Sequence, residues 1–271
     1  MILYDLASPK ERGLLVRIVI KIGTSTLAHP GGRLNIRRTE ELCKIVSDLK
    51  NSGSEIILVS SGAIGMGTGK LSLHDKPKDM PTKQAAAAVG QCELMYTYDR
   101  LFSLYNHTVA QILITAEDVN HEDRHKNFTA TMDRLLEFGV IPIINENDTV
   151  STAEIVIGDN DTLAAIVATT AKADLLILLS DIDGLYTADP RKDKNAKLIP
   201  EVHEMDAYIQ SLGGESGSAL GTGGMRTKLT AAGICMKAGC DMIIANGSDP
   251  QILYRIAAGE SIGTRFFAER E

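Results

Sequence analysis

Six short segments rich in Val, Ile and Leu constrain the fold of this chain more than any other feature. Each ends abruptly at glycine or a polar residue. The segments are VRIVIK (16–21), EIILVS (55–60), TVAQILI (108–114), GVIPIIN (139–145), ADLLILLS (173–180) and DMIIAN (241–246). Because residues on both faces of each segment are apolar, the segments are typical of central strands in a parallel sheet that helices cover on both sides.

Helical patterns separate most of these segments. The clearest, over 39–50, places Leu42, Ile45, Val46 and Leu49 on one stripe. The same spacing predicts helices over 83–104, 124–138, 161–172 and 225–238. Alternating strands and helices, with no linker and no internal repeat, predict a single α/β domain over 1–271, built as a three-layer αβα sandwich with an open, mainly parallel sheet. Residues 1–14 precede the first strand as an N-terminal extension.

Composition and charge exclude several classes of partner. The chain has 271 residues, is 44% hydrophobic and carries a formal net charge of −7, which argues against nucleic acid or an anionic membrane. No apolar run approaches the roughly twenty residues that span a bilayer, and the first residues lack a signal-peptide pattern. We therefore expect a cytoplasmic protein. The four cysteines show no C-x-x-C spacing, which would indicate a metal site. We expect buried free thiols at Cys43, Cys92, Cys235 and Cys240.

The first predicted strand ends in a lysine, at the edge of the sheet where ligands bind in folds of this class. Lys21 is followed by Gly23, Thr24 and Ser25. A lysine at the end of a buried strand costs free energy unless an anion meets it, and Gly23 lets the backbone approach a ligand closely. The alternative is a lysine whose amino group simply reaches solvent, and the sequence leaves both interpretations open.

The stretch GTGGMRTK (221–228) places three glycines ahead of two cations. It does not match the phosphate-loop pattern G-x-x-x-x-G-K-[ST]. It does fit a glycine loop that leads into a helix beginning near Met225, whose free amides attract phosphate. Lys228 lies in the first turn of that helix, where a cation opposes the helix dipole unless an anion binds. A flexible surface loop is the alternative interpretation.

Two clusters of Asn and Asp flank a short hairpin-like segment, TAEIVIG (152–158). Such residues often form turns and caps, but together they can recognise an α-amino acid, with acids for its ammonium and amides for its carboxylate. The clusters contain Asn145, Asn147, Asp148, Asp159, Asn160 and Asp161. Ser60, Ser61 and Gly62 form a turn that can open a helix toward a carboxylate. Ser180 ends the fifth segment and Asp181 follows it. A contact with the ribose or base of a nucleotide and a plain turn explain these two residues equally well.

His121, Glu122 and His125 form an H-E-x-x-H match, which is the helix signature of zinc peptidases. The surrounding stretch is charged on all sides and no third ligand follows at the required spacing. We therefore interpret the match as a coincidence on an exposed helix. A zinc peptidase is nevertheless one alternative function, and tightly held zinc would support it.

Taken in order, the motifs KIGTS, SSGAI, INEND, GDND, GLYTADP and GTGGMRTK resemble those of the amino acid kinase family, from residue 16 to about 265. INEND, GDND and LYTADP together are similar to the members that phosphorylate L-glutamate rather than acetylglutamate, aspartate, carbamate or UMP. The resemblance implies transfer of the ATP γ-phosphate to the glutamate side chain, the first step of proline biosynthesis. It also implies Mg²⁺ as cofactor, a homo-oligomer, and L-proline as an inhibitor. Many members carry a C-terminal RNA-binding-like domain, and we expect the form that lacks it.

The resemblance also implies roles for individual residues. Lys21, Lys228 and Asp161 correspond to catalytic positions, with Asp161 orienting the lysines, and Ser61, Asp148 and Asn160 to substrate-binding ones. The ATP-binding positions are Lys21, Gly23, Ser180, Asp181, Thr222, Gly223, Gly224, Met225, Arg226, Thr227 and Lys228. Because a glutamate side chain is ionised at neutral pH, its attack on phosphorus needs no general base. The remaining alternatives are a family member that acts on acetylglutamate or aspartate, and a nucleotide-binding regulator without activity.

Overall fold

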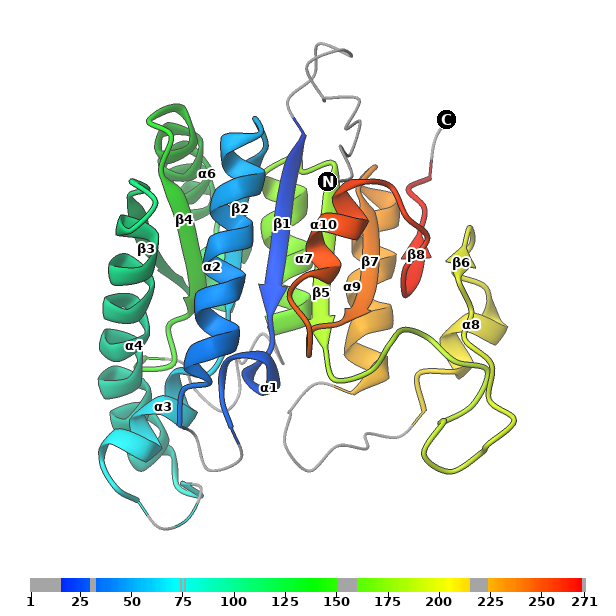
Figure 1. Cartoon of the computed structure of the whole chain (residues 1–271), viewed down its shortest axis with the longest axis horizontal. Helices are drawn as coiled ribbons and strands as arrows, with labels where there is room; N and C mark the ends of the chain where they lie inside the picture. The colour runs from blue at the N-terminus through cyan, green and yellow to red at the C-terminus, as the bar shows by residue number, and fades with distance from the viewer. Residues whose placement is uncertain are drawn as a thin grey trace, which may run out of the picture.

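The computed structural model describes residues 16–29, 33–73, 75, 77–150, 160–214 and 224–269. Its described part is an α/β sandwich in which one eight-stranded sheet lies between two layers of helices (Figure 1). The strands are β1 (Arg17–Ile22), β2 (Glu55–Ser60), β3 (Val109–Ile114), β4 (Ile141–Glu146), β5 (Leu175–Ser180), β6 (Glu201–Val202), β7 (Asp241–Asn246) and β8 (Thr264–Phe266). The predicted sandwich with a mainly parallel sheet is confirmed.

Helices follow most of the strands. The longer ones are α2 (Ile36–Asn51), α3 (Ala63–Lys70), α4 (Met80–Ser103), α6 (Glu122–Glu137), α7 (Asn160–Thr170) and α9 (Met225–Lys237). The short ones are α1 (Thr24–Leu27), α5 (Ala116–Asn120), α8 (Ala207–Ser211) and α10 (Ile252–Ala257). None of the helices among the described residues is both long and apolar enough to cross a bilayer.

The strand order is β3-β4-β2-β1-β5-β7-β8-β6. The six long strands run parallel, and the antiparallel β8 pairs with β7 beyond them. The six apolar segments of the sequence are these six parallel strands, each within two residues of its predicted bounds. The sequence did not predict the two short edge strands, because β6 and β8 span only two and three residues.

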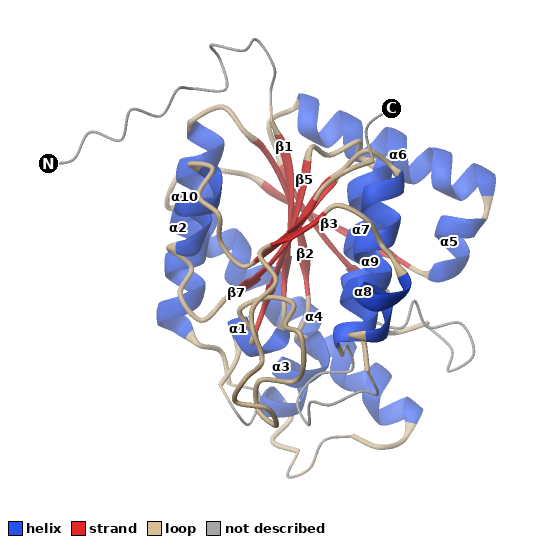
Figure 2. Ribbon diagram, turned by 90° about the vertical axis from the view of Figure 1, so that its right-hand side faces the viewer, coloured by secondary structure: helices blue, strands red, loops and turns tan. Residues whose placement is uncertain are grey.

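The sheet carries a hydrophobic core on each face, because residues that alternate along its strands point to opposite sides. Val19 of β1 packs with buried residues of α6, α7 and α9. Ile18, Ile20 and Ile22 of the same strand pack with buried residues of α2 and α4 on the other face. The view in Figure 2 shows α2 and α10 on one side of the sheet, with α7 and α9 on the other.

The helix predicted over 39–50 presents its apolar stripe to the second core, as expected. Leu42, Ile45, Val46 and Leu49 are all buried there. Three of the four cysteines are buried free thiols, but Cys92 is exposed on α4, which corrects the expectation that all four would be buried. The helix has apolar and polar positions mixed around its circumference, so its sequence does not mark which side faces the core.

The carboxyl ends of the central strands lie at one edge of the sheet. The register pairs Ile22 with Ser60 and Ser180 with Asn246, each the last residue of its strand. In Figure 1 the arrowheads of β1 and β5 point to the lower edge, where α1 and α3 lie. The loops that carry Lys21, Ser61, Asp148 and Ser180 therefore leave the sheet on the same side.

Candidate active site

Two lysines from distant parts of the chain meet on one buried carboxylate at this edge. Lys21 Nζ, at the end of β1, lies 2.7 Å from Asp161 Oδ1, and Lys228 Nζ, in the first turns of α9, lies 2.8 Å from Asp161 Oδ2. The side chains are 12%, 7% and 1% exposed for Lys21, Lys228 and Asp161. The group carries one net positive charge in a largely dry environment, so it favours a further anion.

The ammonium groups keep Asp161 ionised. Burial by itself would raise the pKa of the Asp161 carboxyl, but the charges of Lys21 and Lys228 and their hydrogen bonds outweigh it and hold that pKa well below its usual value. Asp161 lies in the first turn of α7, and its position between β1 and α9 places the two lysines on either side of it. The carboxylate thus separates two cations that would otherwise repel each other.

Three helices that start at this edge lack side-chain caps. The N-cap residues of α1, α3 and α9 are Gly23, Gly62 and Gly224, and none of these helices has an acidic residue in its first turn. By contrast, side chains cap α2, α4, α5 and α8 at Asn35, Asp79, Thr115 and Asp206. A helix start with free amides and no acid attracts anions, so this edge is built for negative charge.

Two of these glycines tolerate a side chain poorly. Gly62 has a φ of 100°, in the left-handed region that side chains disfavour. At Gly23 an added Cβ would lie 3.2 Å from the Leu179 carbonyl, so that neighbour would have to move slightly. The same Cβ would lie 3.7 Å from Lys21 Nζ, which places Gly23 beside that ammonium group.

The first turn of α9 adds a hydroxyl to the group. Thr227 Oγ1 lies 2.8 Å from the Gly224 carbonyl and 3.2 Å from Asp161 Oδ2. Met225 is half-buried and Arg226 is exposed. The helix begins at the residue that the sequence predicted, and Lys228 points to Asp161 from it. Thr222 and Gly223, the other predicted residues of this loop, lie outside the described residues, as do Asp159 and the segment 152–158.

A network of side-chain amides joins β4, α4 and α7 beside Ser61. Asn160 Nδ2 lies 2.9 Å from the Ser60 carbonyl, 2.7 Å from Ser61 Oγ and 3.0 Å from Asn145 Oδ1. Asn145 Nδ2 donates in turn to Gln91 Oε1 at 2.9 Å. The structure therefore brings the predicted residues Ser61 and Asn160 into direct contact. Sequence reasoning missed Gln91, because the sequence of α4 does not mark which of its sides is buried.

Asp148 follows β4 in the turn after Asn147. Burial, and to a lesser extent the nearby carboxylate of Glu146, raises the pKa of Asp148 to about 6. A carboxylate held in such surroundings gains from a cationic partner, since the partner offsets both the lost hydration and the repulsion. Asp148 is thus suited to an ammonium group rather than to a phosphate.

Ser180 ends β5, on the other side of β1 from the amide network, and Asp181 follows it. Ser180 Oγ lies 3.3 Å from Asp181 Oδ1, and the Ser180 carbonyl accepts from the Gly247 amide at 2.8 Å. Close by, Asp183 accepts from Asn246 Nδ2 at 2.7 Å and from the Tyr186 hydroxyl at 3.0 Å. The sequence did not indicate this second cluster, because Asp183 and Asn246 are 63 residues apart.

The H-E-x-x-H match does not form a zinc-binding helix face. His121 is the N-cap residue of α6 and has an extended backbone (φ −93°, ψ 119°) rather than helical angles. The His125 Nδ1 atom lies 3.2 Å from the Val119 carbonyl. Across the described residues, no group of three or more His, Cys, Asp or Glu side chains could hold a metal ion. Glu122 and His125 lie in the largely exposed first turn of α6, and α5 ends at Asn120, directly before His121.

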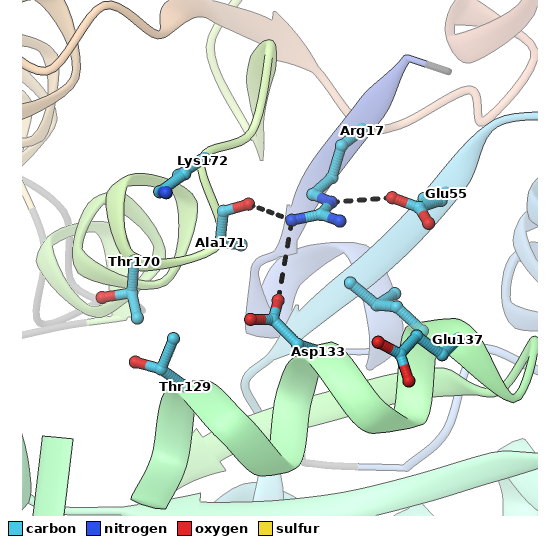
Figure 3. A pocket seen from close by; sticks show the side chains of 9 residues that line it. Arg17, Glu55, Thr129, Asp133, Glu137, Thr170, Ala171 and Lys172 are labelled. Atoms are coloured by element: carbon cyan, nitrogen blue, oxygen red, sulfur yellow. Dashed lines mark hydrogen bonds and ion pairs between the residues drawn. The ribbon is translucent and has the colours of Figure 1, made fainter. Parts of the chain in front are cut away.

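A cavity of about 370 Å³ lies at the opposite edge of the sheet, where β1 and β2 begin (Figure 3). Its central side chain is Arg17, whose Nε lies 2.8 Å from Glu55 Oε2 and whose Nη1 bonds to the Ala171 carbonyl and approaches Asp133. The guanidinium is thus occupied by acceptors of the protein itself. We place the chemistry at the carboxyl edge, where the lysines, the uncapped helix starts and the amide network converge.

Known proteins share both the sequence and the fold. The amino acid kinase family matches residues 16–246. A glutamate 5-kinase of Caldanaerobacter subterraneus is 53% identical over 93% of this chain and 68% of its own length. One of Clostridium perfringens is 51% identical over 94% of this chain and 96% of its own length.

Two solved structures share the fold at low identity. A UMP kinase of Bacillus anthracis has a TM-score of 0.63 at 17% identity, covering 94% of this chain and 96% of its own. A carbamate kinase of Giardia lamblia bound to AMP-PNP has a TM-score of 0.66 at 17% identity, covering 94% and 99%. The fold, the motifs and the close relatives agree, and the chain belongs to the glutamate 5-kinases of the amino acid kinase family.

Proposed function

We propose that the chain transfers the γ-phosphate of ATP to the side-chain carboxylate of L-glutamate, forming L-glutamyl 5-phosphate for proline biosynthesis. The observation that carries the proposal is the pair of ammonium groups on Asp161, beside the uncapped start of α9. Relatives that cover most of this chain are named glutamate 5-kinases, which favours glutamate over acetylglutamate or aspartate as the substrate.

The chemistry that this group supports is the approach of one anion to another. The glutamate side chain is already a nucleophile at neutral pH, but it must approach a polyanionic triphosphate in line. Phosphoryl transfer therefore depends on positioning and on positive charge. In the proposal, Lys21 and Lys228 contact the transferred phosphoryl group from two sides, while Asp161 holds them apart. Free amides at the start of α9 and at Gly23 bind the remaining phosphate oxygens.

Substrate recognition is assigned to the other side of β1. Asp148 pairs with the α-ammonium of glutamate, which relieves the unfavourable burial of its carboxylate. The hydroxyl of Ser61 and the uncapped amides of α3 receive a glutamate carboxylate. Ser180 and Asp181, on the opposite side, contact the nucleoside. The two substrates would then meet over Lys21, the last but one residue of β1.

In the proposal, Mg²⁺ binds to the protein together with the nucleotide. Mg²⁺ prefers oxygen ligands and is commonly held through substrate phosphates. Asp161 is poorly placed to bind it, since each of its oxygens already lies beside an ammonium group. The proposed co-substrate is therefore the magnesium complex of ATP. We further expect a cytoplasmic homo-oligomer that L-proline inhibits, and these properties rest on the family resemblance.

Trapping the product with hydroxylamine tests the function. An acyl phosphate reacts with hydroxylamine to give a hydroxamate, which forms a coloured complex when Fe³⁺ is added. The protein is therefore incubated with ATP, Mg²⁺, hydroxylamine and one candidate acid at a time. We expect hydroxamate with L-glutamate and little with N-acetylglutamate or L-aspartate. Preferential product from either of the other two acids would refute the proposed substrate.

A further inference from the structure

The amide network beside Ser61 contains a buried residue, Gln91, that no sequence motif marks. Its side chain extends from the middle of α4 and is buried. Gln91 Oε1 accepts from Asn145 Nδ2, and Asn145 Oδ1 accepts from Asn160 Nδ2. Gln91, Asn145 and Asn160 thus form three amides in series, which we name the amide relay. Its outer end, Asn160, is one of the three substrate-binding residues that the family resemblance implies.

The direction of the relay is fixed by a backbone group that cannot turn over. The Glu146 amide donates to Asn145 Oδ1 at 2.9 Å, so this atom must be the acceptor of the Asn145 side chain. Asn145 Nδ2 must then face Gln91, and Gln91 must present its oxygen to it. Because Asn145 Oδ1 is an acceptor, the Asn160 side chain must donate to it through Nδ2.

Two further acceptors hold Asn160 in the same orientation. Its Nδ2 atom also faces the Ser60 carbonyl at 2.9 Å and Ser61 Oγ at 2.7 Å. If the amide turned over, its oxygen would face the oxygens of Ser60 and Asn145 and would repel both. The part of Asn160 that remains for a substrate is therefore its carbonyl oxygen, an acceptor.

Gln91 keeps this orientation at some cost to itself. Its Nε2 atom is buried and has no hydrogen-bond partner in the described part of the chain, a state that destabilises a folded protein. Turning the Gln91 amide over would bring two donor groups together at Asn145. The residue is therefore held in the one orientation that serves its neighbour and leaves its own donor unused.

We infer that Gln91 is a positioning residue that, through Asn145, sets Asn160 to accept a hydrogen bond from the α-ammonium group of the substrate. The inference rests on the proposed function and names a determinant of its substrate specificity. Asn160 and Asp148 then recognise the ammonium together, and the carboxylates of glutamate are bound by other groups. Without the acceptor of Gln91, Asn145 Nδ2 is left buried and unpaired, so the Asn145 side chain shifts and no longer holds Asn160 in place for the ammonium.

The test compares Gln91→Met with Gln91→Glu in steady-state kinetics. Methionine fills a similar volume without a strong acceptor, and we expect the Michaelis constant for L-glutamate to rise about tenfold, as for a lost hydrogen bond to a charged group. Turnover and the Michaelis constant for ATP should change less than about threefold. The variant Gln91→Glu keeps an acceptor oxygen at this position, so its Michaelis constant for L-glutamate should lie close to the native value. Equal impairment of both variants would contradict the inference.

A substrate analogue separates recognition of the ammonium from recognition of the carboxylates. Glutarate keeps both carboxylates of glutamate and lacks the ammonium. Its inhibition constant should be the same for the native chain and for Gln91→Met. If the inhibition constant of glutarate also rises tenfold, Asn160 binds a carboxylate of the substrate rather than its ammonium, and the inference is wrong.

A neighbouring variant controls for loss of core packing. Leu94 lies one turn along α4 and is fully buried, so Leu94→Ala should lower the melting temperature and leave the Michaelis constant for glutamate unchanged. In Gln91→Met the unpaired donor Gln91 Nε2 is removed and Asn145 Nδ2 becomes unpaired instead. The number of unpaired donors stays the same, so the melting temperature should change little. If the native chain forms no glutamyl hydroxamate, the proposed function fails. If it does and Gln91→Met binds glutamate normally, only the role of Gln91 fails.

Discussion

Asp161 and its two lysines show how single residues create this site. Lys21 ends a strand and Lys228 lies in the first turns of a helix, and each alone has an ordinary structural explanation. Their ammonium groups lie 2.7 and 2.8 Å from one carboxylate, which makes them a single positively charged unit. Placing cations before an anion arrives avoids a reorganisation cost during the reaction.

Removing either cation should reduce turnover sharply. We expect Lys21→Ala and Lys228→Ala each to lower kcat by a hundredfold or more, roughly 3 kcal/mol of transition-state stabilisation. The hydroxamate assay with saturating substrates measures this. Lys237→Ala, at the exposed last turn of the same helix α9, is the matched control and should leave kcat unchanged. Near-native turnover in either active-site variant would show that its ammonium does not act on the phosphoryl group.

The carboxyl group of Asp148 should give glutamate binding a pH dependence. Its pKa is raised to about 6, so it is ionised above that pH and neutral below it. A neutral Asp148 attracts an ammonium poorly, and kcat/KM for glutamate should therefore fall as the pH drops below about 6. In Asp148→Asn this acidic limb should disappear, with kcat/KM for glutamate low throughout and the Michaelis constant for ATP little changed. An unaltered acidic limb in the variant would assign the titration to another group.

The sequence predicted individual site residues where a motif marked them, and missed those that only the fold brings in. Lys21, Asp161 and Lys228 lie in motifs, but their distances to one another depend on how β1, α7 and α9 pack. Gln91 belongs to an alanine-rich helix whose sequence shows no site. Its role depends on a contact with Asn145, 54 residues away, which no local pattern encodes.

At the scale of elements, α3 and α4 pack backbone against backbone. A Cβ added at Gly90 of α4 would lie 1.7 Å from the Ala63 carbonyl, and one added at Gly67 of α3 would lie 1.8 Å from the Ala86 carbonyl. No side chain fits between the helices at these points. The contact fixes the start of α3, and with it Ser61 and Gly62, against the helix that carries Gln91.

Gly90→Ala should therefore disturb the substrate site without touching it. Since the added methyl group overlaps the Ala63 backbone, α3 must shift, and we expect a loss of stability of about 1–3 kcal/mol or more. The Michaelis constant for glutamate should rise while that for ATP stays near its native value. Thermal unfolding and steady-state kinetics measure the two effects.

Gly233→Ala is the matched control for this prediction. Gly233 lies within α9, and nothing lies within 4 Å of an added Cβ there. Alanine should keep or raise stability by up to about 1 kcal/mol. If Gly90→Ala were as harmless as Gly233→Ala, the close packing of α3 on α4 would be refuted.

Elements were predictable from the sequence where burial leaves a pattern. The six parallel strands are apolar on both faces, and this separated them from helices without further information. Strands β6 and β8 are too short for such a pattern. The helix α3 has the sequence AIGMGTGK, in which glycines weaken the helical signal, and its formation depends on packing against α4 rather than on local preference.

At the scale of the whole molecule, the fold brings together loops that are far apart in the chain. The sheet holds the carboxyl ends of β1, β2, β4 and β5 at one edge, and two cores on its opposite faces keep that edge rigid. The proposed nucleotide side, with Ser180 and Asp181, lies beyond β1 in one direction. The proposed glutamate side, with Ser61 and the amide relay, lies in the other. The two lysines lie where these sides meet.

The most direct test of the account is a crystal structure of the protein with L-glutamate and a non-hydrolysable ATP analogue. We expect the terminal phosphate between Lys21 Nζ and Lys228 Nζ, within hydrogen-bonding distance of both, with the glutamate side-chain carboxylate in line beside it. A terminal phosphate that lies away from both ammonium groups, for example in the cavity around Arg17 at the opposite edge of the sheet, would contradict it.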